Sequence, residues 1–109
     1  MEHSSQVTNF LKKSNEIVIK EIGKVIRFEM KEQGGFSRSD YSDLEKMQTK
    51  MFQANNDMIV NPNDIFVSFR EFSSRYKIQP QIETKLKELE ENQLKNENNA
   101  TISTTQYGR

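Results

Sequence analysis

The residues best suited to recognition chemistry cluster around Pro80 in this 109-residue chain. A proline is well placed in the first turn of a helix, and four polar residues surround this one: Gln79, Gln81, Thr84 and Lys85. Glutamine can bond bidentately to adenine, lysine reaches guanine or phosphate, and threonine can contact phosphate or a thymine methyl group. A helix that starts with such side chains could read the major groove of double-stranded DNA.

The sequence contains no comparable cluster of potentially catalytic residues. The chain lacks cysteine, which excludes disulfides, thiolate catalysis and cysteine-based metal sites. The single histidine, His3, lies near the terminus, so neither a catalytic triad nor a histidine metal site is credible. We find no glycine-rich phosphate loop. The sequence therefore predicts a protein that is not an enzyme and that uses no cofactor and no metal.

Composition limits the size and the partners of the protein. Basic and acidic residues are equal in number, at 16 each, so any affinity for DNA must come from local placement of charge. Only 33% of the residues are apolar, which predicts one domain with a thin core and leaves no room for a small-molecule effector domain. A thin core is often completed by a second copy, so we expect a homodimer.

The chain shows no membrane or export signal at the sequence level. No run of 18 apolar residues occurs, and the first residues do not form a basic stretch followed by an apolar one. We expect a cytoplasmic protein that does not enter a membrane.

A long helix is predicted at the N-terminus and ends at Gly34 and Gly35. The alternative is a β-hairpin, because 17–19 and 25–30 are rich in β-branched or aromatic residues and could turn near Gly23. We favour the helix because 21–24 lacks the Asn-Gly or Asp-Gly of a tight hairpin. Residues 1–35 are then a dimerisation or docking helix, whose apolar positions have helical spacing: Val7, Phe10, Leu11, Val18, Ile22, Val25 and Ile26.

The remaining residues, 39–106, are predicted to form a three-helix core. A first helix begins near a capping box of Ser42 and Glu45. Its methionines, with Met58, are interpreted as core packing. After a short extended run at 58–60, Ser68 is expected to cap a second helix. The third helix, from about Pro80 to Gln93, has its apolar residues on one face.

The segment after Leu94 combines an asparagine-rich turn with a threonine-rich, β-prone stretch. Two short strands there would form a β-hairpin wing, and a disordered polar tail is the alternative. With the wing, the fold class is a mainly α winged helix-turn-helix with a long N-terminal helix. The wing adds four residues to the predicted DNA contacts: Lys95, Asn98, Asn99 and Thr101.

The stretch from Met58 to Leu94 resembles the DNA-binding domain of GntR-type transcription regulators. In that family a Leu-Pro-Ser-x-Arg-Glu-Leu-Ala run precedes the recognition helix. Here Ser68, Arg70 and Glu71 match that run, with Phe66 and Phe72 in place of leucines. The resemblance implies that Ser68 and Arg70 contact the DNA backbone or bases.

Two functions remain open on these grounds. The first is sequence-specific binding of double-stranded DNA, by a small transcription regulator or by a plasmid or phage factor that marks a DNA site. The second is a small helical protein–protein interaction subunit or phage inhibitor, in which 6–32 and 80–95 face a partner. The role of Arg70 is equally open, because Glu71 and Asp64 offer it an intramolecular ion pair instead of a DNA contact.

Overall fold

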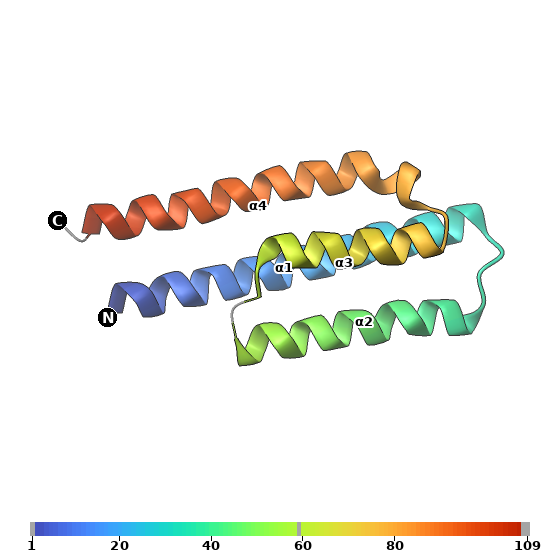
Figure 1. Cartoon of the computed structure of the whole chain (residues 1–109), viewed down its shortest axis with the longest axis horizontal. Coiled ribbons are helices and arrows are strands. Elements are labelled where there is room, and N and C mark those ends of the chain that lie inside the picture. Colours follow the sequence, from blue (N-terminus) through green and yellow to red (C-terminus); the bar gives the residue numbers. More distant parts are fainter. Residues whose placement is uncertain (1, 59, 108–109) are drawn as a thin grey trace.

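The computed structural model describes the backbone of residues 2–58 and 60–107, and the side chains of 8–58 and 60–95. These residues form four helices, each antiparallel to the one before it (Figure 1). The first and last helices lie side by side. The helices are α1 (Glu2–Gln33), α2 (Arg38–Asp57), α3 (Pro62–Arg75) and α4 (Gln79–Tyr107). The described part of the chain is therefore an all-α four-helix domain.

The predicted long N-terminal helix is confirmed as α1, and the hairpin alternative for 17–30 is wrong. Ile19, Ile22 and Ile26 all point into the core from one face of the helix, which outweighs the β-propensity of the individual residues. Gly23 is a packing position and not a turn. A Cβ atom on it would collide with the side-chain amide of Gln48, so glycine leaves room for this amide to donate to the Ile19 carbonyl at 3.2 Å.

The connection between α1 and α2 contains the two glycines that were expected to end the first helix. Both adopt positive φ, 72° at Gly34 and 82° at Gly35, a conformation that glycine tolerates best. The capping box is formed by Ser37 and Asp40, and not by the predicted Ser42 and Glu45. The Ser37 Oγ accepts from Asp40 N at 3.2 Å, and Ser37 N donates to the Asp40 carboxylate at 2.9 Å.

The connection between α2 and α3 is shorter than predicted, and its residues Met58 and Asn61 have extended backbone. The helix α2 continues to Asp57, and Met58 is its C-cap. The helix α3 begins at Pro62, where the side chain of Asn61 accepts from Asn63 N at 2.9 Å. Ser68, the predicted cap, instead lies in the middle of α3. The expected core methionine Met58 is 68% exposed.

The predicted wing is wrong, because α4 continues as a helix to Tyr107 and the described residues contain no strand. The alternative of a disordered polar tail stays a prediction. An isolated two-stranded hairpin is marginal without a further strand or a packing surface. Extending a helix that already exists needs no new nucleus and adds one hydrogen bond per residue.

The core lies where α3 faces α1 and α4. Phe66, Phe69 and Phe72 of α3 are at most 1% exposed, and they share one apolar cluster with the α1 isoleucines and with Ile82 and Leu86 of α4. α1 packs most extensively against α4 and next against α2, and α3 packs against α4. α2 and α3 make little direct contact although they are consecutive in the chain. None of the helices, over the described residues, is long and apolar enough to cross a membrane.

Candidate functional site

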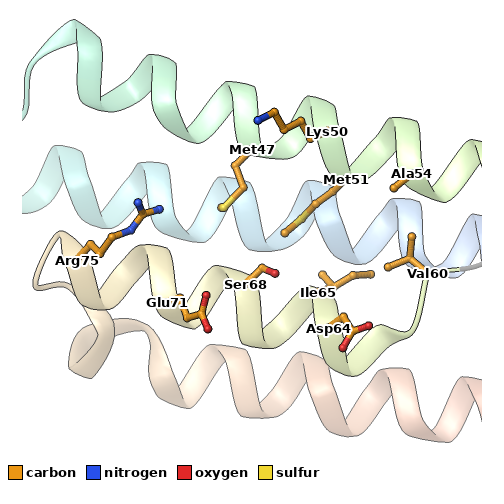
Figure 2. A pocket seen from close by; sticks show the side chains of 10 residues that line it. All are labelled: Met47, Lys50, Met51, Ala54, Val60, Asp64, Ile65, Ser68, Glu71 and Arg75. Carbon is orange, nitrogen blue, oxygen red and sulfur yellow. The ribbon is translucent and has the colours of Figure 1, made fainter.

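A groove of about 380 Å³ runs between α2 and α3 and is open to solvent (Figure 2). We call it the α2–α3 groove. α2 and α3 contribute side chains from their facing sides, and the connection between them closes one end. The lining residues are Met47, Lys50, Met51, Ala54, Val60, Asp64, Ile65, Ser68, Glu71 and Arg75.

The floor of the groove is apolar and only partly covered. Ile65 is buried, whereas Met47, Met51 and Val60 are half-buried and pack against the core from its edge. Methionine is unbranched and polarisable, and it adapts to partners of different shape. The floor can therefore accept an apolar side chain from another molecule.

The rims of the groove are charged. Lys50 stands on the α2 side, and Asp64 and Glu71 stand on the α3 side (Figure 2). None of these three forms an ion pair with another described residue, so their charges face solvent. The α2 rim is therefore basic, whereas the α3 rim is acidic at Asp64 and Glu71 and basic at Arg75.

A buried polar layer fixes one end of the groove. We give this name to Ser14 and Asn15 of α1, Asn55 of α2 and Gln93 of α4. Asn15 Nδ2 donates to the Val60 carbonyl at 2.8 Å and to Asn55 Oδ1 at 3.2 Å. Gln93 Nε2 donates to Asn15 Oδ1 at 2.8 Å, and Ser14 Oγ donates to Gln93 Oε1 at 2.6 Å. Every buried side-chain polar atom among the described residues is satisfied, so the layer stabilises one arrangement of the helices.

Tyr76 fixes the other end. Its hydroxyl donates to Asp43 Oδ2 of α2 at 2.8 Å, and its ring packs on Phe72 and Phe36 with centroid distances of 4.5 and 5.9 Å. Burial, together with the hydrogen bond to the Asp43 carboxylate, raises the pKa of Tyr76 to about 12. The phenol therefore stays neutral at physiological pH. The α2–α3 groove is held at both ends and open between them.

The opposite flank of α3 is closed by Arg70. Its guanidinium donates to both Glu90 oxygens of α4 at 3.0 and 3.1 Å, and its Nε donates to Glu83 Oε1 at 3.1 Å. The Glu90 hydrogen bond raises the pKa of Arg70 against the opposing effect of burial. Burial alone would raise the pKa of Glu83, but Arg70 outweighs it and the pKa is lowered. The structure thus places Arg70 in an intramolecular ion pair.

The predicted DNA-contacting residues are divided between different surfaces. Gln81, Thr84 and Lys85 are exposed at the start of α4, and Gln79 beside them is half-buried. Ser68 lies elsewhere, on the side of α3 that lines the α2–α3 groove.

The predicted contacts beyond Leu94 fall on the far part of α4. Lys95 is exposed. Asn98, Asn99 and Thr101 belong to the same helix, but their side chains lie outside the described residues.

Sequence reasoning missed the α2–α3 groove because it interpreted Met47 and Met51 as core. Both residues do pack against the core, but from its edge. The available signal was Lys50 next to Met51, because a charged residue there limits how deeply the methionine face can be buried. That Ala54 and Ser68 would line the same groove depends on how α2 and α3 are placed, which the sequence alone does not reveal.

Comparison with known proteins assigns the chain to no family. No protein-family model, no curated protein and no solved structure matches it. Among the described residues, no three His, Asp or Glu side chains come together as a potential metal site. The α2–α3 groove and the exposed start of α4 are the features from which a function can be argued.

Proposed function

We propose that this chain is a small helical protein–protein interaction subunit that binds an amphipathic helix of a partner protein in the α2–α3 groove. The observation that carries this proposal is the partly exposed apolar floor between two antiparallel helices. Such a surface is what helix-in-groove recognition uses, because the apolar face of the incoming helix replaces water along the floor. Tyr76 and the buried polar layer keep the groove formed before the partner arrives.

The charges on the rims specify the partner further. Lys50 on the α2 side favours an acidic residue on one border of the incoming helix. Asp64 and Glu71 on the α3 side favour basic residues on its other border. A helix with opposite charges along its two borders would therefore enter the groove in one orientation.

Arg70 and the position of α4 favour this function over DNA binding. The charge of Arg70 is already neutralised by Glu83 and Glu90, so a DNA contact would have to break that ion pair. The total charge is zero, and α4 packs along α1 instead of projecting from the domain. A protein partner needs neither a net positive charge nor a free helix.

The test compares variants that carry the same side chain on neighbouring residues. Ser68→Arg places a long charged side chain into the groove, and Val67→Arg places it at an adjacent α3 position that is 43% exposed. Chemical cross-linking followed by affinity capture should recover a partner with the native chain and with Val67→Arg, but not with Ser68→Arg. Circular dichroism must show the same helix content in all three proteins.

A partner recovered equally with both variants would refute binding in the groove. Met51→Lys, which alters the opposite wall, provides a second variant if Ser68→Arg fails to fold. Sedimentation equilibrium of the full chain addresses the expected homodimer. If it shows a dimer that Ser68→Arg dissociates, the occupant is a second copy and the proposed partner is wrong.

DNA binding is the second candidate, and one observation favours it. Gln81, Thr84 and Lys85 are all exposed in the first turns of α4, and Lys24 of α1 lies on the same surface as Gln81 and Lys85. A lysine and a glutamine at the start of a helix, with the Lys24 side chain of α1 beside them, suit a phosphate and a base edge. The resemblance to GntR-type regulators supports the same candidate.

A gel-shift titration with mixed duplex DNA at low and moderate salt tests this candidate. If DNA binds at the start of α4, Lys85→Ala should weaken binding and lower the salt slope by about 1. Lys46→Ala removes the same charge from an exposed position on α2 and serves as the control. Absence of a shift at low salt would exclude DNA binding and leave the helix-binding proposal unaffected.

A further inference from the structure

The side of α1 that faces away from the core carries three large apolar residues. Phe10, Ile17 and Phe28 are 44%, 62% and 63% exposed. At about 100° per residue they lie within about 20° of one line, which runs for about 27 Å along the helix. We call this line the outer face of α1. It is separate from the α2–α3 groove, which α1 does not line.

Basic residues border the outer face on one side. At about 100° per residue, Lys13, Lys20, Lys24 and Lys31 all fall between the apolar line and α2. The direction of α2 is marked by Arg27, whose guanidinium lies 3.9 Å from Glu45 of that helix. We call these four exposed lysines the lysine border.

The lysine border keeps most of its charge available. Lys13 and Lys31 form no ion pair with any described residue. Lys20 and Lys24 approach Glu16 and Glu21 at 3.6 Å, but all four side chains are exposed, and such pairs contribute little. A row of lysines beside apolar side chains attracts an acidic partner.

We propose that the outer face of α1 is a second docking surface, which takes an amphipathic helix whose apolar seam is bordered by acidic side chains. The apolar seam packs on Phe10, Ile17 and Phe28, and the acidic border pairs with the lysine border. The narrow line fits the seam of a single helix, whereas a membrane-surface helix presents a broad apolar face. Two copies of α1 packed antiparallel would bring their lysine borders together, which like charges oppose.

With this surface, the protein would join two helical partners, one in the α2–α3 groove and one on α1. At its Phe28 end the surface continues onto α4, where Gln81, Ile82 and Lys85 line a shallow groove beside Phe28. Lys85 adds a further positive charge at that end, and Glu29 is the acidic residue that lines it. The strongest attraction for an acidic helix is therefore expected along the lysine border.

The experiment uses two synthetic helical peptides that share one leucine seam. One peptide has glutamate on both borders and the other has lysine, and fluorescence anisotropy measures their binding to the full chain. We expect binding of the glutamate peptide and none of the lysine peptide. Phe28→Ser should weaken binding of the glutamate peptide by about tenfold or more. The double variant Lys13→Glu with Lys31→Glu should weaken it by a similar factor. This double variant should also bind the lysine peptide.

Matched controls make the outcome specific to α1. Lys46→Glu with Lys95→Glu changes the same number of charges on α2 and α4 and should leave binding unchanged. Ser68→Arg should also leave it unchanged, so this test can fail while the groove proposal stands. Equal binding of the two peptides, or no effect of the charge reversal, would overturn the inference. So would binding to vesicles of phosphatidylcholine and phosphatidylserine without binding of the glutamate peptide.

Discussion

The two flanks of α3 meet their neighbours in opposite ways. Toward α4, Arg70 bonds to Glu83 and Glu90 above a core of buried phenylalanines, and the helices close on each other. Toward α2, the flank carries Ser68 and Glu71, and the hydrogen bonds described there lie at the two ends of the groove. The closed flank uses side chains within the chain, whereas the open flank leaves apolar surface and charge for another molecule.

Loss of a core aromatic on the closed side should have the largest effect. Phe69 is fully buried, so Phe69→Ala removes packing on every side and leaves a cavity. We expect the free energy of unfolding to fall by about 3–5 kcal/mol. Urea denaturation followed by circular dichroism measures this change. Val67→Ala on the same helix, at a residue that is 43% exposed, should change stability by no more than about 0.5 kcal/mol.

The buried polar layer comes next, because it holds one end of the open side. Asn15→Ala would leave Asn55 Oδ1 and Gln93 Nε2 without the partners they have in the native chain, although Asn55 keeps its bond to Lys12 O and Gln93 its bond from Ser14. Unsatisfied buried polar groups are costly, so we expect the free energy of unfolding to fall by about 2–3 kcal/mol. The exposed Thr49→Ala, which also loses a side-chain hydrogen bond, should cost no more than about 0.5 kcal/mol. Equal melting of the two variants would mean that the layer does not brace the groove.

These two flanks also show what the sequence could reveal. The apolar spacing from Val7 to Met30 was enough to predict α1, but Phe10, which was assigned to the buried stripe, lies on the exposed side of the helix. Gly23 was misinterpreted in the hairpin alternative because its role depends on Gln48, which is distant in the sequence. The spacing of apolar residues along the chain predicts a helix and its buried face, but it does not identify the neighbouring helix.

The wing and Arg70 illustrate the same limit. The asparagine and threonine residues after Leu94 have turn and strand propensity, but no sheet is present among the described residues to pair with them. Arg70 has Glu71 and Asp64 close in sequence, yet its partners are Glu83 and Glu90 on the next helix. An ion pair was correctly considered for Arg70, but its partners depend on how α3 and α4 pack.

Removing the Arg70 side chain should have an intermediate effect. Arg70→Ala leaves Glu83 and Glu90, which are 27% and 38% exposed, facing each other without a cation. We expect a loss of about 1–2 kcal/mol, since partial exposure reduces the cost of breaking the pair. Arg75→Ala, on the rim of the groove, should lower the free energy of unfolding by only about 0.5 kcal/mol, because it removes the contact with the Phe72 ring. If Arg75→Ala destabilises the protein more than Arg70→Ala, the flank toward α4 is not the more tightly bonded one.

The smallest effect is expected in the acid dependence of the closed flank. Arg70 holds the pKa of Glu83 below the ordinary value of 4.5, although burial acts in the opposite direction. A depressed pKa means that the folded chain binds the proton more weakly than the unfolded chain. The stability contributed by this carboxylate is therefore fully present above pH 4.5 and is lost as the pH falls through the folded pKa.

Glu83→Gln removes that contribution at every pH, so the variant and the native chain should differ at neutral pH and converge in acid. Urea denaturation at several values between about pH 7 and about pH 3 measures the difference. Glu71→Gln on the open flank provides the control, because Glu71 forms no ion pair with a described residue and its curve should parallel that of the native chain. If Glu71→Gln and Glu83→Gln both converge with the native chain in acid, the ion pair does not distinguish the closed flank from the open one.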